Sequence, residues 1–138
     1  MGVDLEEDLK RKMVELNLCA ADSRKSPLTG YLHTHASLPD AWDAIPLLEN
    51  FCYVLALFRS RQTERIAEGK ILLERLLAFE VNGNFPIYLH EYPLCKDRQM
   101  GLDILPVLHW LQKEFHGALG PVLFKRVKLL TCRILSQA

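Results

Sequence analysis

The chain has 138 residues, of which 49% are hydrophobic and 25% are charged, and this composition is typical of a single globular domain. Its 17 basic and 17 acidic residues cancel, whereas a nucleic-acid-binding protein that works by charge needs a basic surface. No hydrophobic run approaches the ~20 residues that span a bilayer, and the acidic start does not resemble a secretory signal. We therefore expect a protein without a nucleic-acid or membrane partner.

Four cysteines are spread singly along the chain, at Cys19, Cys52, Cys95 and Cys132. Metal ligands usually lie close together in sequence, so this spacing gives little indication of a metal site. An even number of cysteines permits disulfides, but nothing in the sequence indicates secretion. We expect reduced and mostly buried thiols in a cytoplasmic protein.

Hydrophobic residues recur at helical spacing along almost the whole chain. This predicts an all-α fold of about five helices, stacked as two antiparallel hairpins and a terminal helix. The residues predicted to be helical are 4–20, 41–59, 62–80, 101–117 and 121–136. One stripe of the first helix carries Leu5, Leu9, Met13, Leu16 and Ala20. The second helix is hydrophobic on nearly every side and is expected at the centre of the fold.

Two short motifs occur twice in the same order, which predicts an internal repeat within one domain, 1–138. Tyr-Leu-His begins at Tyr31 and again at Tyr88, and Asp-x-Ile/Leu-Pro begins at Asp43 and again at Asp103. The repeated units are expected at 4–59 and 62–117, with the helix 121–136 after them.

The Asp-x-x-Pro motif has two structural explanations. In the first, the aspartate is an N-cap and Pro46 or Pro106 lies in the first helical turn, where a missing N–H costs nothing. In the second, the helices begin earlier and kink at these prolines. The segment Ser37–Asp40 has the spacing of a capping box, which supports an earlier start of the second helix.

Within the connection 81–99, residues 85–89 are the one stretch that resembles a strand, and they are expected to pair briefly at an edge. The connection combines turn residues with aromatic side chains and includes Asn82-Gly83-Asn84-Phe85-Pro86. This segment resembles the Gly-x-Phe-Pro turns in helical hairpins of the α/α toroid families, such as six-hairpin glycosidases, polysaccharide lyases and prenyl or terpenoid cyclases. Because about five helices are fewer than a complete toroid contains, the resemblance implies a partial toroid or a small solenoid. It also implies that the loops at one rim line a cleft. No catalytic residue is carried over.

Six residues of the repeated loops are candidates for a ligand site: Tyr31, His33, Tyr88, His90, Glu91 and Tyr92. If the repeats stack, these residues share a rim and form a polar, aromatic groove for a sugar or a peptide. A histidine beside a glutamate suits acid–base chemistry, although adjacent residues on an extended loop point to opposite sides. The alternative is structural, with both Tyr-Leu-His motifs clamping their loops onto the helix ends.

Other histidines give weaker indications of a functional site. His33-Thr34-His35 has the spacing of a metal-binding pair, but a site needs a third ligand, and no metal is expected. His109 and His116 share a face of one helix, and we expect at least one of them to be partly buried. The sequence has no glycine-rich phosphate loop and no recognisable nucleophile motif, so no cofactor is expected.

Two functions are consistent with these features. The first is a non-catalytic helical-repeat module that binds a protein partner or forms a homodimer, because an uncovered hydrophobic face usually marks an interface. The second is a carbohydrate- or small-molecule-binding or -processing protein of the α/α-toroid type that uses the 81–99 loop. In that case Tyr88, His90 and Glu91 would converge with Tyr31 and His33 in an open cleft.

Overall fold

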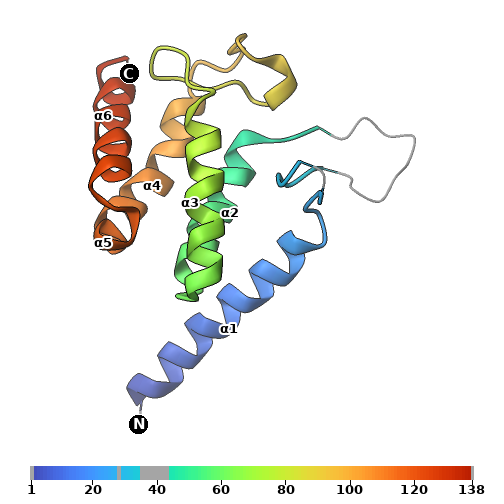
Figure 1. The fold of residues 1–138 in the computed structure, drawn as a ribbon, viewed down its shortest axis with the longest axis vertical. Coiled ribbons are helices and arrows are strands. Elements are labelled where there is room, and N and C mark those ends of the chain that lie inside the picture. The colour runs from blue at the N-terminus through green and yellow to red at the C-terminus, as the bar shows by residue number, and fades with distance from the viewer. Residues whose placement is uncertain (1, 28, 35–43, 138) are drawn as a thin grey trace.

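The computed structural model describes residues 2–27, 29–34 and 44–137, and it confirms an all-α fold. The described residues contain six α-helices, one short 3-10 helix and no strand (Figure 1). These elements are α1 (Gly2–Asp22), α2 (Leu47–Arg59), α3 (Thr63–Leu77), η1 (Leu89–Glu91), α4 (Met100–Glu114), α5 (His116–Leu119) and α6 (Pro121–Gln137). Within this part of the chain, no helix is long and hydrophobic enough to cross a membrane.

Helix α2 lies at the centre of the fold, as its sequence predicts. It packs against α1, α3 and α4, while α6 packs against α4 and the short α5 lies against both of these (Figure 1). The residues of α2 that are buried are Leu47, Asn50, Phe51, Tyr53, Val54, Leu55, Leu57 and Phe58. A short connection, Ser60–Gln62, joins α2 to α3, so these two helices form a hairpin.

The predicted helix 101–117 is divided in the structure. Helix α4 ends before Phe115, whose φ of −126° and ψ of 32° are not helical. The Phe115 side chain is buried and lies against Phe58, with 5.4 Å between the ring centroids. Helix α5 ends at Leu119 and is followed by Gly120, whose φ of 82° favours glycine. Core packing of one aromatic side chain thus accompanies the break in a helical sequence.

The two prolines of the Asp-x-x-Pro motifs occupy different positions. Pro46 immediately precedes α2 in an extended conformation, with φ of −75° and ψ of 125°. Pro106 lies inside α4, which begins well before it, at Met100. The N-cap explanation therefore fails for Asp103, which is itself within the helix. Asp43 and the predicted capping box lie outside the described residues.

The connection between α3 and η1 is held by a tight turn. Val81 and Asn84 exchange two backbone hydrogen bonds of 2.8 and 3.1 Å, and Gly83 between them has a φ of 80°. The Asn84 side chain donates to the Asp97 carbonyl over 2.9 Å and accepts from the Gly101 amide over 2.7 Å. These bonds make Asn84 a structural residue of the connection.

The following residues, 85–89, pair briefly with the segment before α2, as expected for an extended stretch. Tyr88 forms an isolated antiparallel bridge with Pro46, flanked by backbone hydrogen bonds from Leu47 to Ile87 and from Leu89 to Ile45. Phe85 is fully buried against Phe51 in an edge-to-face contact, with 5.2 Å between the ring centroids. The connection is therefore packed into the core at its start.

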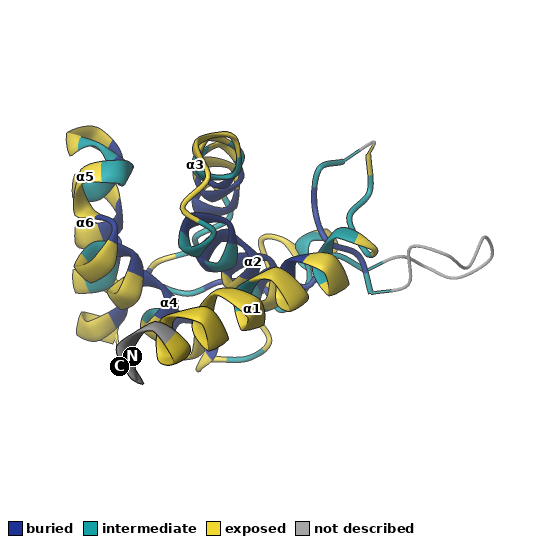
Figure 2. Ribbon diagram, turned by 90° about the horizontal axis from the view of Figure 1, so that it is seen from below, coloured by how far each residue is buried: buried dark blue, intermediate teal, exposed yellow. Residues whose placement is uncertain are grey.

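Helix α1 contacts the rest of the molecule through its C-terminal half. Leu18 is buried and Val14 is half-buried, whereas the described side chains from Leu5 to Met13 are exposed (Figure 2). The N-terminal half of α1 therefore projects beyond the other helices, as Figure 1 shows.

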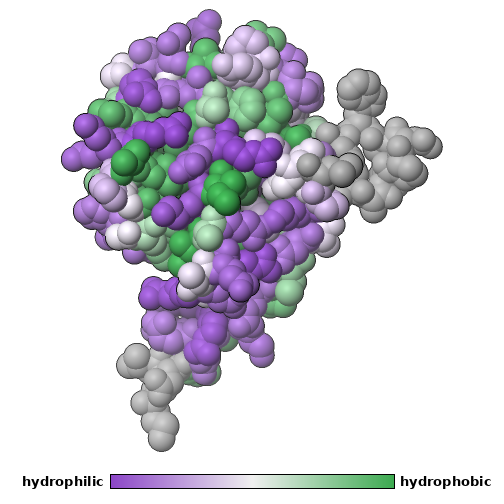
Figure 3. All heavy atoms as spheres, in the orientation of Figure 1, coloured by the Kyte–Doolittle hydropathy of each residue, from purple (hydrophilic) through white to green (hydrophobic). Residues whose placement is uncertain are grey.

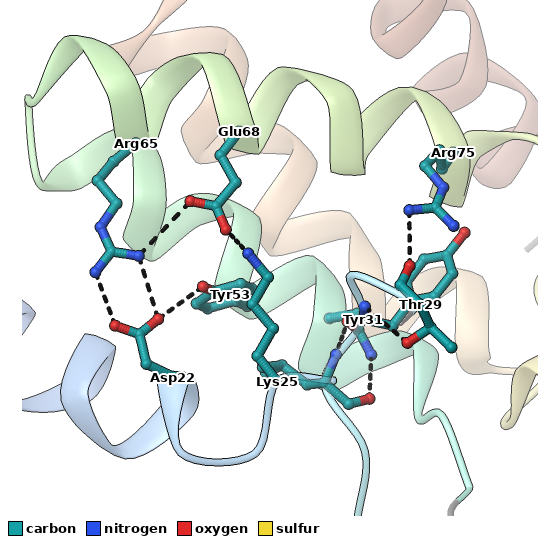
Figure 4. Close-up of polar contacts among 10 residues, drawn as sticks. Asp22, Lys25, Thr29, Tyr31, Tyr53, Arg65, Glu68 and Arg75 are labelled. Atoms are coloured by element: carbon teal, nitrogen blue, oxygen red, sulfur yellow. Dashed lines mark hydrogen bonds and ion pairs between the residues drawn. The ribbon is translucent and has the colours of Figure 1, made fainter. Parts of the chain in front are cut away.

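A polar cluster fixes the C-terminal end of α1 to α2 and α3 (Figure 4). Arg65 donates to both carboxylate oxygens of Asp22 over 3.2 and 2.7 Å, and the Tyr53 hydroxyl donates to the same carboxylate over 2.8 Å. An ion pair between Lys25 and Glu68 lies beside this group. Burial acts to raise the pKa of Asp22, but the hydrogen bonds of Arg65 and Tyr53 and the nearby positive charges outweigh it and lower this pKa.

This cluster predicts acid sensitivity at one carboxylate. Because the folded state lowers the pKa of Asp22 below the ordinary 3.8, its contribution to stability is complete above that pH. The contribution is lost as the pH falls through the lowered pKa. We expect Asp22→Asn to lower the urea midpoint at neutral pH and to reduce its further fall from about pH 6 to about pH 2.

A suitable control is Glu74→Gln, because Glu74 is exposed on α3. This variant should retain the acid dependence of the parent chain. If the urea midpoint depends on pH in the same way for Asp22→Asn and for the parent, the cluster does not stabilise the attachment of α1.

The prediction of mostly buried thiols is wrong. The cysteines are free, with Cys19, Cys52 and Cys132 exposed and Cys95 half-buried. Cys19 and Cys132 lie on helix faces turned away from the body, while the helices bury their leucine, isoleucine and valine positions instead. Helical spacing shows which face of a helix carries a cysteine. It does not show whether that face is buried, because the large hydrophobic side chains decide which face packs on the body.

Candidate protein-docking groove

The residues of the first Tyr-Leu-His motif are buried. The Arg75 guanidinium lies over the Tyr31 ring, 4.3 Å from its centroid, and also donates to the Thr29 carbonyl over 2.8 Å (Figure 4). The His33 ring nitrogen Nε2 lies 2.8 Å from the Thr29 hydroxyl. Arg24 and His33 are joined by two further bonds through the His33 backbone. Both predicted site residues thus hold the loop in place.

The residues of the second motif are more open to solvent. Tyr88 is half-buried and stacks on the exposed His90, with 5.9 Å between the ring centroids. Glu91 pairs with Lys96 over 2.8 Å, and this hydrogen bond keeps the pKa of Glu91 below its usual value. Tyr92 is exposed and makes an edge-to-face contact with Phe79.

The two motifs flank the same segment at the start of α2 but differ in exposure. The first is fastened to Asn50 through Leu32, and the second pairs with Pro46. His33 is buried and His90 is exposed. His35 lies outside the described residues, and among the described ones no group of three potential metal ligands occurs. None of the six predicted site residues lines either of the two cavities described next.

The larger cavity is an open groove between α4 and α6 with a volume of about 670 Å³. We call it the α4–α6 groove. Its lining residues are Leu102, Leu105, Pro106, His109, Trp110, Gln112, Lys113, Thr131 and Leu135. A smaller cavity of about 90 Å³ lies on the other side of α6, beside the bidentate ion pair of Glu80 and Arg133. The face shown in Figure 3 carries only small groups of hydrophobic residues among hydrophilic ones.

The groove arises because α4 has two hydrophobic faces. One face is buried in the core and includes Ile104, Val107, Leu108 and Leu111. The other face lines the groove, and on it Leu102 is 39% exposed and Trp110 is 38% exposed. Helix α6 contributes Leu135, which is 56% exposed although it follows the buried Ile134.

Pro106 removes one backbone hydrogen bond from α4. Proline has no N–H, so the carbonyl of Leu102 lacks the donor that residue i+4 supplies in a regular helix. Both residues line the groove.

The polar side chains of the groove include one cation, Lys113, and two side chains that join the helices, Gln112 and Thr131. Gln112 links the two helices by donating to the Thr131 hydroxyl over 2.9 Å and to the Leu108 carbonyl over 3.1 Å. The Lys113 ammonium lies 5.3 Å from the centroid of the Trp110 ring. No aspartate or glutamate lines the groove. The lining therefore carries a positive charge at Lys113 and no negative charge.

The expectation that His109 or His116 is partly buried is wrong, since both are exposed. His109 contacts the edge of Trp110, and His116 stacks on Phe124 with 4.0 Å between the ring centroids. An aromatic ring thus lies beside each imidazole, although both histidines are exposed. The second hydrophobic face of α4 was visible in the sequence only as leucine and tryptophan outside the core spacing.

Comparison with known protein families, with curated proteins and with solved structures finds no match for this chain. The resemblance to toroid hairpins therefore stays an expectation from the sequence.

Proposed function

We propose that this protein is a non-catalytic helical module that binds a partner protein through the α4–α6 groove. The observation that supports this most is that Trp110, which is 38% exposed, lines a largely hydrophobic groove, because tryptophan is enriched among the residues that dominate binding energy at interfaces. The groove is also formed by two packed helices, so it is largely present before a partner binds.

The partner that fits best is an amphipathic helix with acidic residues beside its hydrophobic face. Helices commonly bind in grooves of this kind by placing residues i, i+3 or i+4 and i+7 against the wall. Leu102, Trp110 and Leu135 would receive the hydrophobic side chains. Lys113, which has no carboxylate partner within the groove lining, would pair with a flanking glutamate or aspartate.

A cytoplasmic location belongs to the same proposal, since four free thiols suit a reducing compartment. The carbohydrate-binding alternative receives less support. It needs Tyr31 and His33 to face a ligand together with Tyr88 and His90. Tyr31 and His33 are buried, and their side chains are engaged with Arg75 and Thr29.

The test is a selection of helical peptides from a display library against the whole chain, followed by calorimetric titration of the selected peptides. We expect the selected sequences to combine a hydrophobic stripe with flanking acidic residues. Trp110→Ala should weaken their binding by ~tenfold or more, because a buried aromatic anchor typically contributes at least that much. Leu135→Glu should weaken peptide binding further, since it adds a negative charge that repels the acidic residues of the peptides.

The matched control is Ile71→Glu, which places the same charge at an equally exposed hydrophobic position on α3. This variant should bind the peptides as the parent does. A library that yields no binder, or binders that are as sensitive to Ile71→Glu as to Leu135→Glu, would overturn the proposal.

A further inference from the structure

The turn between α3 and η1 places an exposed asparagine directly before a glycine. Asn82 is exposed, and its side chain makes no hydrogen bond with any other residue that the structure describes. Asn82 and Gly83 have positive φ values of 51° and 80°, as the centre of a type I′ turn requires. Glycine has no Cβ, so the backbone nitrogen that follows Asn82 is little obstructed.

The Asn82 side chain and the Gly83 nitrogen can react with each other, because a bond between them closes a five-membered ring. The nitrogen bonds to Cγ of Asn82 and gives up its proton, the bond from Cγ to the side-chain nitrogen breaks, and ammonia leaves. Water then adds to either carbonyl of the cyclic imide and breaks one C–N bond. The product is aspartate or isoaspartate, and water is the only other reactant. Asparagine is counted among the thermolabile residues.

The folded turn opposes this ring closure. The Gly83 amide donates to Oε2 of Glu80 over 3.1 Å, and Arg133 holds the Glu80 carboxylate by two hydrogen bonds of 2.6 Å. The ring closes only after the peptide between Asn82 and Gly83 rotates, and this rotation breaks the bond to Glu80. The rate of the reaction therefore depends on how often the turn opens.

Isoaspartate does not fit the closed turn, because it lengthens the backbone by one carbon. A Cβ atom on Gly83 would lie 2.8 Å from the Arg133 carbonyl oxygen, and a Cβ atom on Gly101 would lie 2.6 Å from the Gly83 carbonyl oxygen. The turn is therefore in close contact with both α6 and α4. A longer backbone cannot keep these contacts together with the two hydrogen bonds between Val81 and Asn84. Conversion at this position would release the turn from both helices.

We propose that Asn82 is a site of spontaneous deamidation, and that the hydrogen bond from Gly83 to Glu80 controls its rate. Loss of ammonia makes the conversion irreversible, so the fraction of chains with a released turn increases with the age of the protein. This inference is independent of the proposed groove function, because none of these three residues lines the α4–α6 groove.

Peptide mapping by mass spectrometry, after incubation of the whole chain at mildly alkaline pH, tests the site. We expect aspartate and isoaspartate at Asn82. The other asparagines precede leucine or phenylalanine: Asn17, Asn50 and Asn84. They should stay intact over the same time. A folded chain that shows no conversion at Asn82, or faster conversion at another asparagine, would overturn the proposal.

Two substitutions test the control of the rate. Glu80→Ala should accelerate the conversion by ~tenfold, because the Gly83 amide loses a hydrogen bond to a charged group. Glu74→Gln, at an exposed glutamate of α3, should leave the rate unchanged. Asn50→Ala removes hydrogen bonds far from the turn and should also leave it nearly unchanged. If Asn50→Ala accelerates the conversion as much as Glu80→Ala does, global unfolding controls the rate and Glu80 does not.

Urea unfolding tests the release of the turn. Asn82→Asp adds the negative charge of the products without lengthening the backbone, so it should change the urea midpoint little. The isoaspartate form, separated by chromatography from the aged parent chain, should unfold at a lower urea concentration than Asn82→Asp. Equal midpoints would show that the turn accommodates the extra backbone carbon, which contradicts its release.

Discussion

Replacement of Asn50 by alanine is expected to lower the free energy of unfolding by about 3 kcal/mol, through the loss of buried hydrogen bonds. Asn50 is fully buried in α2. Its Oδ1 accepts from the Leu32 amide over 2.8 Å, and its Nδ2 donates to the carbonyls of Leu32 and Pro46 over 3.1 and 2.7 Å. Leu32 is only 3% exposed, so water does not easily replace the lost partner.

The measurement is urea unfolding followed by far-ultraviolet circular dichroism. Glu49→Gln is the control, because Glu49 is the exposed neighbour that pairs with Arg24. An exposed ion pair contributes little, and we expect a change below ~0.5 kcal/mol. A cost below ~1 kcal/mol for Asn50→Ala would show that the Tyr31–His33 loop is held by its other contacts.

Gly101→Ala is expected to destabilise the protein by about 2 kcal/mol or more, because a methyl group has no room there. A Cβ atom at this position would lie 2.6 Å from the backbone carbonyl oxygen of Gly83 and 3.4 Å from the Ile134 side chain. The Gly101 amide is also bonded to Asn84, so a shift of α4 would strain that bond. The nearest of these atoms belongs to the backbone, so no flexible side-chain end can move away from the added methyl group.

Gly117→Ala supplies the matched control in thermal unfolding. No atom lies within 4 Å of the position of its Cβ, and the residue is exposed within α5. Alanine is favoured over glycine in a helix, so this variant should gain about 0.5–1 kcal/mol. Equal effects of the two substitutions would contradict the close approach of α4 to the turn at Gly83.

The sequence was sufficient to predict the elements that depend on local pattern. The hydrophobic run of α2 correctly placed it at the centre, and residues 85–89 were correctly expected to pair briefly, as they do at Tyr88. Identical motifs did not predict identical conformations, because Pro46 precedes a helix whereas Pro106 lies inside one. A proline restricts its own backbone, but the tertiary contacts decide where the helix starts.

The candidate surfaces were harder to predict for a different reason. Periodicity shows that α1 has a hydrophobic stripe, but it does not show whether another element covers that stripe. The α4–α6 groove likewise depends on the angle at which two helices meet, since Trp110 and Leu135 are far apart in the chain. Burial of Tyr31 and His33 follows from their contacts with Arg75 and Thr29, and residue types alone do not specify such partners.

Because α2 is central, some parts of the molecule must unfold together with it, whereas others can unfold separately. Any opening of α2 disrupts its contacts with α1, α3 and α4 together, so these segments are coupled in unfolding. The N-terminal half of α1 shares none of this coupling, because its described side chains make no buried contact with the body. It frays at a free-energy cost well below that of global unfolding.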